Sequence, residues 1–232
     1  MIKLAVGILT HNVMSFDRLE LLKRTTDSVV SVFGESSLFI VDNGSWDGTN
    51  GVVARICEGT KIKHLSSWDG DGTYGPGRGR NFIQKHFLDT DADVFVCSDD
   101  DVVWRAEAAK GIAEFWSEAP AGLAILSGLL EPEWSWNTPR GVVEAGGRRA
   151  LVRDSAPAAA WSYRRKDVDA IYPLRETLSD LGEDYAACVR LREAGRTVAQ
   201  MDLAEHIGWG KSTHGNNAVS WARPLDRSRW GV

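Results

Sequence analysis

The sequence predicts a single α/β domain in which a mainly parallel central sheet is flanked by helices. Short runs of apolar and β-branched residues alternate with longer segments whose apolar residues recur at helical spacing, as in strand–helix–strand units. Polar residues follow several of the expected strands where they end. Because open α/β sheets bind ligands beyond the carboxyl ends of their strands, these residues are the first candidates for a functional site.

The composition supports one globular domain with a sizeable core, since 43% of the 232 residues are hydrophobic and 25% are charged. The net charge of −5 argues against a general binder of nucleic acids or membrane surfaces. Three scattered cysteines without metal-binding spacing indicate reduced thiols, so we expect a cytoplasmic protein. No apolar run reaches the length of a membrane span.

The first half of the chain is expected to contain four strands, at 3–9, 38–41, 62–65 and 94–97. Helices are expected at 16–33, where Gly34 is the stop signal, from 49 through 56, and at 81–87. The order predicts right-handed crossovers and parallel pairing. A loop at 66–79 contains five glycines, which suit close backbone approach to another group or simple flexibility.

In the second half, helices are expected at 106–116 and 183–194, and strands at 123–129, 161–164 and 197–201. Residues 131–140 form an aromatic loop, and 141–172 are the least readable stretch. The stretch from 139 to 166 contains seven basic residues and two acidic ones. This excess of positive charge predicts either a solvated surface or a site for an anionic acceptor. These basic residues are Arg140, Arg148, Arg149, Arg153, Arg164, Arg165 and Lys166.

Three consecutive carboxylates, Asp99, Asp100 and Asp101, follow the strand at 94–97. Like charges at this spacing repel, so at least one carboxylate must be protonated unless a cation lies between them. Oxygen ligands suit Mg²⁺ or Mn²⁺, which share their coordination with substrate phosphates. In an extended chain Asp99 and Asp101 point to one side and Asp100 to the other, so the former two are expected at the metal. The alternative is a solvated acidic turn.

Five segments occur in a fixed order along the chain: GILTHN at 7–12, FIVDNGSWDGT at 39–49, GPGRGRN at 75–81, SDDD at 98–101, and GEDYAACVRLREAG at 182–195, which His206 follows. Together they resemble the GT-A-type nucleotide-sugar glycosyltransferases, family 2 in particular. The resemblance implies a GT-A, Rossmann-like single domain over 1–232. Residues 1–104 would bind the nucleotide sugar, 105–217 would bind the acceptor and carry catalysis, and 218–232 would be a tail.

The resemblance also implies a donor site and a metal site. The nucleotide-sugar donor, with a UDP-sugar favoured, would be bound at the first two strand ends, at the start of the helix near 81 and by the acidic triplet. The residues concerned are Thr10, Asn12, Asp42, Arg78, Arg80, Asn81, Asp99 and Asp100. Mn²⁺ or Mg²⁺ would be bound by Asp99, Asp101 and His206, with His214 as the other candidate histidine.

Glu183 and Asp184 resemble the catalytic-base motif of the inverting members of this family. The two side chains diverge by about 100° around a helix axis, so only one can face the sugar. Geometry alone does not choose between them, and the motif favours Asp184 as the base with Glu183 beside it. The alternative is a pair of acids that complements the helix dipole.

The expected activity is metal-dependent transfer of a hexosyl or pentosyl group, with inversion, to a hydroxyl of a glycan or other anionic acceptor. Trp134, Trp136 and Trp209, which lie in polar or glycine-rich segments, are the candidates to stack on the acceptor, and the alternative for each is packing under a loop. One alternative is glycosylation of hydroxylated bases in phage-type DNA. An alternative of another class is a non-catalytic nucleotide-sugar-binding protein.

Overall fold

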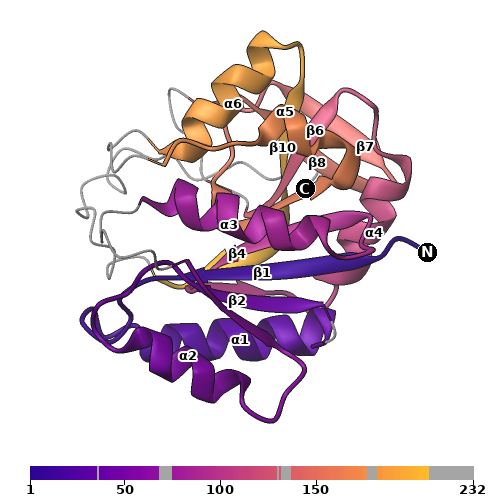
Figure 1. Cartoon of the computed structure of the whole chain (residues 1–232). Helices are drawn as coiled ribbons and strands as arrows, with labels where there is room; N and C mark the ends of the chain where they lie inside the picture. The colour runs from indigo at the N-terminus through magenta and orange to yellow at the C-terminus, as the bar shows by residue number, and fades with distance from the viewer. Residues whose placement is uncertain (36, 68–74, 130, 132–136, 177–181, 209–232) are drawn as a thin grey trace.

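A computed structural model describes residues 1–35, 37–67, 75–129, 131, 137–176 and 182–208 (Figure 1). In this part of the chain ten strands form one sheet. The strands are β1 Leu4–Thr10, β2 Leu38–Asp42, β3 Lys63–Ser66, β4 Val94–Asp99, β5 Val102–Trp104, β6 Leu123–Leu129, β7 Gly141–Ala145, β8 Arg148–Arg153, β9 Trp161–Arg164 and β10 Thr197–His206.

Helices cover both faces of the sheet (Figure 1). They are α1 Leu19–Phe33, α2 Thr49–Cys57, α3 Pro76–Leu88, α4 Ala108–Glu118, α5 Val168–Ile171 and α6 Glu183–Glu193, with 3₁₀ turns at Ala158–Ala160 and Arg165–Asp167. Helices α1, α2 and α4 pack on one face, and α3, α5 and α6 on the other. None of the described helices is both long and apolar enough to cross a membrane.

The core has two layers because the strand side chains alternate between the faces of the sheet. In β1, Val6 and Ile8 pack into the layer that contains α1, whereas Ala5 and Leu9 pack into the layer that contains α3. All three cysteines are buried in these layers and free.

The strand order is β3-β2-β1-β4-β9-β6-β10-β8-β7, with β5 paired to β10. The parallel order turns around at β1, which has β2 on one side and β4 on the other. This reversal creates a topological switch point between β1 and β4, where open α/β sheets bind ligands. The ends of these strands are level, since Thr10 is in register with Asp42 and Leu9 with Asp99.

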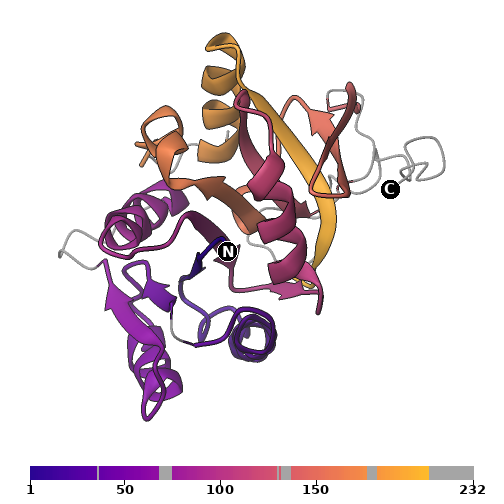
Figure 2. The same ribbon diagram turned by 90° about the vertical axis from the view of Figure 1, so that its right-hand side faces the viewer.

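Strand β9 runs antiparallel between β4 and β6 and closes the sheet across its middle. Strand β10 is parallel to β6, and in Figure 2 it runs as a long yellow strand from α6 toward α1. Its last residue, His206, is opposite Val102 of β5. The chain end of β10 therefore lies beside the acidic triplet.

The predicted α/β class is confirmed, and the strand predicted at 123–129 has the bounds of β6. The helix expected at 81–87 instead begins at Pro76, so two of the glycines assigned to a loop lie inside α3. A Cβ on Gly77 would lie 1.8 Å from the carbonyl oxygen of Arg175, and one on Gly79 would lie 2.4 Å from Leu9. These glycines therefore allow α3 to pack closely against its neighbours.

Candidate active site

The candidate site lies at the switch point, beyond the carboxyl ends of β1 and β4. Strand β1 contributes Thr10, the end of β4 contributes Asp99, and the last residue of β10 is His206. Helix α6 begins with Glu183 and Asp184. The contacts below connect all of these elements.

Asp100 is buried and held from two sides. Thr10 donates from Oγ1 to Asp100 Oδ2 at 2.6 Å. Arg18 donates from Nη2 to Asp100 Oδ1 at 2.5 Å and to Asp101 Oδ2 at 2.7 Å. Burial raises the pKa of Asp100 to about 7, although the positive charge of Arg18 opposes this rise.

The strand alternation expected along the triplet does not continue beyond Asp99, although the charges of Asp99 and Asp101 both act on His206. Strand β4 ends at Asp99, and Asp100 and Asp101 lie in the turn that leads to β5. The turn brings Asp100 and Asp101 to one guanidinium, while Asp99 contacts Arg80 instead. Two arginines therefore supply part of the positive charge that three adjacent carboxylates require.

Arg80 joins the two halves of the site. Its side chain is 3% exposed, and Nη2 lies 2.5 Å from Asp99 Oδ1. Its other terminal nitrogen, Nη1, pairs with Glu183 Oε1. Burial raises the pKa of both Asp99 and Glu183, and Arg80 opposes the rise. The guanidinium expected at the diphosphate is therefore engaged by two carboxylates.

Asp101 and His206 form the pair in this site that best fits a divalent metal. His206 Nε2 lies 3.1 Å from Asp101 Oδ1, and Ile207 donates its backbone N–H to the Asp101 carbonyl at 2.8 Å. Burial acts to raise the pKa of Asp101, but His206 and Arg18 hold it below its usual value. A carboxylate with an imidazole suits Mn²⁺. Within the described ranges, no group of three or more His, Cys, Asp or Glu side chains is arranged to hold a metal ion.

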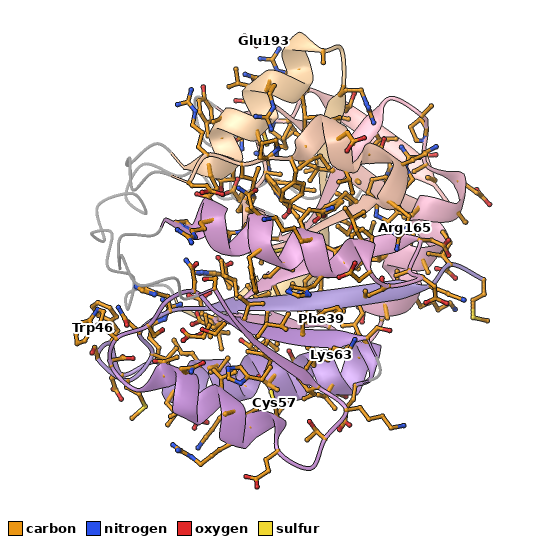
Figure 3. The ribbon with its side chains drawn as sticks, viewed as in Figure 1. Phe39, Trp46, Cys57, Lys63, Arg165 and Glu193 are labelled. Carbon is orange, nitrogen blue, oxygen red and sulfur yellow. The ribbon has the colours of Figure 1, made fainter. Side chains whose placement is uncertain are left out.

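Asn12 and Asp42 shape the loop beyond β1 and β2. Ser45 donates to Asp42 Oδ1 from its N–H at 3.2 Å and from its hydroxyl. Asn12 donates its backbone N–H to Ser45 Oγ at 2.8 Å and accepts from the Trp46 N–H at 3.1 Å. The ring of Trp46 projects outward at the edge of the molecule, with the residue 69% exposed (Figure 3). This loop thus presents an aromatic surface beside the end of β2.

Asn81 and Arg78 lie on the first turns of α3. Asn81 donates to the Leu174 carbonyl at 3.0 Å and to Glu176 Oε1 at 2.8 Å, and its own Oδ1 accepts from the Leu174 N–H. Its amide therefore fastens α3 to the segment at 174–176. Arg78 is half-buried and precedes Arg80 by two residues in α3.

Glu183 and Asp184 point in different directions, as their helical spacing predicts. Glu183 contacts Arg80, whereas Asp184 Oδ2 accepts from the Ala158 N–H at 3.3 Å. Asp184 Oδ1 accepts from the Tyr185 N–H at 2.7 Å. The carboxylate of Asp184 therefore accepts from the turn before β9, while its charge still acts on Arg80 and Glu183.

The expected acceptor residues Trp134, Trp136 and Trp209, and His214, lie outside the described residues. The basic stretch at 139–166 does not form a free cationic surface in the described structure. All six of its arginines have internal partners. Arg140 pairs with Asp154, Arg148 with Glu114, Arg149 with Glu144 and Arg164 with Asp167, while Arg153 and Arg165 donate to main-chain carbonyls.

Sequence reasoning missed Arg18. It precedes the first residue of α1 and is 82 residues away from Asp100 along the chain. The negative charge of the triplet could have indicated it. Three adjacent carboxylates need a nearby cation, and the loop after the neighbouring strand β1 can supply one. Arg18 is the basic residue of that loop.

The family model described as "Glycosyl transferase family 2" matches residues 6–142. None of the curated proteins matches the sequence. Among solved structures, S. aureus TarS 1–349 in complex with UDP-GlcNAc is similar with a TM-score of 0.59 at 17% identity, over 89% of this chain and 61% of that one. GalNAc-T7 with UDP, GalNAc and Mn²⁺ is similar with a TM-score of 0.60 at 12% identity, over 88% of this chain and 43% of that one.

At these identities the likeness to both solved structures concerns the fold. The chain spans about three fifths of the TarS 1–349 chain and less than half of the GalNAc-T7 chain.

Proposed function

Because the chain belongs to glycosyl transferase family 2, we propose that it transfers a sugar from a UDP-sugar to an acceptor hydroxyl, with a divalent metal and with inversion. The observation that carries this proposal is the convergence at one switch point of the β4 carboxylates, His206 and the acidic start of α6. UDP is preferred as the nucleotide because the similar structures of TarS and GalNAc-T7 contain UDP-GlcNAc and UDP, respectively.

Asp101 and His206 are the residues that would hold Mn²⁺ or Mg²⁺, with phosphate oxygens of the donor completing the coordination. A bound divalent ion would supply a Lewis acid that offsets the charge on the departing diphosphate. Asp99 takes a supporting role in this proposal, since its carboxylate pairs with Arg80. Arg18 and Arg80 limit repulsion among the carboxylates before the donor binds.

The donor would lie along the edge formed by Thr10 and Asp42, with the nucleoside against the loop after β2. Arg78 and Arg80, on the first turns of α3, are the residues proposed for the diphosphate, and Arg80 also pairs with Asp99 and Glu183. In the reaction, the bond between the anomeric carbon and the phosphate oxygen breaks, and UDP leaves with the electron pair. A new bond forms between that carbon and the acceptor oxygen.

Asp184 is the proposed base. An acceptor hydroxyl is a poor nucleophile at neutral pH and needs a positioned group to take its proton. The guanidinium of Arg80 occupies one carboxylate oxygen of Glu183, whereas Asp184 receives only main-chain donors among the contacts above. We therefore assign the proton to a carboxylate oxygen of Asp184.

The proposal is tested by thermal shift with UDP or GDP, with and without Mn²⁺, and by release of UDP from UDP-sugars. The wild type is expected to be stabilised by UDP with Mn²⁺ and to release UDP. Asp101→Asn should lose the metal-dependent shift. Asp184→Asn should keep the shift and lose transfer by about 100-fold or more, as expected for a missing general base.

Asp202→Asn is the matched control, because Asp202 lies on β10 four residues before His206 and pairs with Arg105. It should behave as the wild type in both assays. Normal transfer by Asp184→Asn would remove the base assignment. A wild type that binds UDP but neither hydrolyses nor transfers any UDP-sugar would instead be a non-catalytic binder.

The DNA alternative gains no support from the described structure. It depends on free basic residues between 139 and 166, and all six arginines there have internal partners.

A further inference from the structure

A cluster of buried polar residues holds Glu131 at the carboxyl end of β6. Gln200 donates to Glu131 Oε2 at 3.1 Å, and Asn137 donates to the same oxygen at 3.2 Å. The Glu131 N–H donates to Gln200 Oε1 at 3.2 Å, and Arg153 donates to the Glu131 carbonyl at 2.8 Å. Gln200 and Asn137 are completely buried and Arg153 is 2% exposed. Buried hydrogen-bond partners therefore hold Glu131 in place.

The two amide donors do not by themselves require a carboxylate. A glutamine at position 131 could accept from Asn137 and Gln200 through its carbonyl oxygen, without the cost of a partly buried charge. Burial raises the pKa of Glu131, which means that its surroundings disfavour the ionised form overall. Arg153 favours the ionised form, but its donors Nη1 and Nη2 bind the main-chain carbonyls of Asn137 and Glu131. The charge therefore points to a role beyond this cluster.

Glu131, through its partners, and Asp184 are both hydrogen-bonded to the backbone of the segment 155–158. The Ser155 carbonyl accepts from Asn137 and Gln200, the two residues that hold Glu131. Three residues later, the Ala158 N–H donates to Asp184. The two carboxylates also influence each other electrostatically, since the charge of Asp184 contributes to the raised pKa of Glu131. Both carboxylates belong to the second half of the chain.

We propose that Glu131 accepts a hydrogen bond from the acceptor, and that the acceptor bound beside Asp184 is an uncharged sugar bearing hydroxyl groups. This inference rests on the transferase activity proposed above. Oε2 accepts from two amides, whereas Oε1 accepts no hydrogen bond from the described residues, so Oε1 can receive a donor from a ligand. Two neighbouring carboxylates attract hydroxyl donors and repel phosphate or carboxylate groups, and the arginines of the described stretch 139–166 are engaged by internal partners.

The test compares two acceptors that differ by one carboxylate, p-nitrophenyl β-D-glucopyranoside and p-nitrophenyl β-D-glucuronide, with UDP-glucose, UDP-galactose and UDP-GlcNAc as donors. Donor hydrolysis in the absence of acceptor is measured in parallel. The wild type should use the glucoside at least about tenfold better than the glucuronide. Glu131→Gln should lower kcat/KM for the glucoside by about 10- to 100-fold, the range for a hydrogen bond to a charged group, and leave donor hydrolysis unchanged.

Glu131→Asp keeps the charge on a shorter side chain, so it should transfer poorly but retain the preference for the glucoside. Glu131→Gln should reduce that preference. Glu193→Gln is the control for loss of one negative charge, because Glu193 is exposed at the far end of α6 (Figure 3). Urea unfolding of each variant separates a loss of fold from a loss of acceptor binding.

Unchanged transfer by Glu131→Gln, or equal use of both glycosides by the wild type, overturns the inference. So does a wild type that hydrolyses the donor and transfers to neither glycoside, although the proposed transferase function survives that result through donor hydrolysis. A wild type inert toward every UDP-sugar overturns both proposals.

Discussion

Replacing Arg80 by glutamine is expected to lower the free energy of unfolding by about 3 kcal/mol. The change leaves two carboxylates without their shared cation, Asp99 with a side chain 27% exposed and Glu183 with one 10% exposed. Removing one partner of a buried ion pair costs about 3–5 kcal/mol. Water reaches Asp99 and screens its charge in part, so the lower end of this range applies. For a chain of this length the loss corresponds to a decrease in Tm of about 6–12 °C.

Urea unfolding at pH 7 measures this effect, with Arg105→Gln as the matched control. Arg105 pairs with Asp202 at 2.9 Å, but its side chain is 46% exposed, so its loss should cost less than about 1 kcal/mol. Arg80→Lys keeps the charge and cannot reproduce the forked contact, so it should fall between glutamine and the wild type. If Arg80→Gln is no less stable than Arg105→Gln, the account of Arg80 as the shared counterion is wrong.

Two further predictions concern packing and pH. Gly77→Ala should destabilise the protein by about 1–3 kcal/mol, because its Cβ would overlap the Arg175 carbonyl, whereas Gly51→Ala in α2 should stabilise it by about 0.5–1 kcal/mol, since its Cβ meets only the tip of Arg55 at 3.8 Å. Equal unfolding midpoints for these two variants would contradict the packing role of Gly77. Burial raises the pKa of Glu131 above 4.5, so the stability it contributes is complete below that value and is lost as pH rises through its folded pKa. Glu131→Gln should therefore gain stability relative to the wild type as pH rises above the usual range of a glutamate, and a difference that stays constant over this rise would refute the sign.

Much of the fold is readable from local sequence, because its central strands are continuous apolar runs. Strands β1, β4 and β6 are buried on both faces, and this burial selects residues that local patterns detect. Strand β5 has only three residues, and the β7–β8 hairpin is partly exposed, so neither gives a strong local signal. The start of α3 was missed because glycines normally end helices, and their packing role depends on Arg175, which is distant in sequence.

The site, like the fold, can be predicted from the sequence only in part. The sequence identifies which residues lie at the switch point, because the backbone brings the strand ends together there regardless of how the side chains pair. It does not reveal which cation meets which carboxylate, because Arg80 and Glu183 are 103 residues apart and Arg18 and Asp101 are 83 apart. The hydrogen bonds that hold Glu131 were missed for the same reason, since Gln200 is 69 residues away from it along the chain.

The antiparallel position of β9 has a consequence for synthesis on the ribosome. Strands β1 to β4 can pair as soon as they emerge, but the open edge of β4 is covered only when Trp161–Arg164 arrives. At roughly 5–20 residues per second, the nascent chain carries an unpaired β4 edge for several seconds. An uncovered edge of this kind invites pairing with other chains until β9 has been translated.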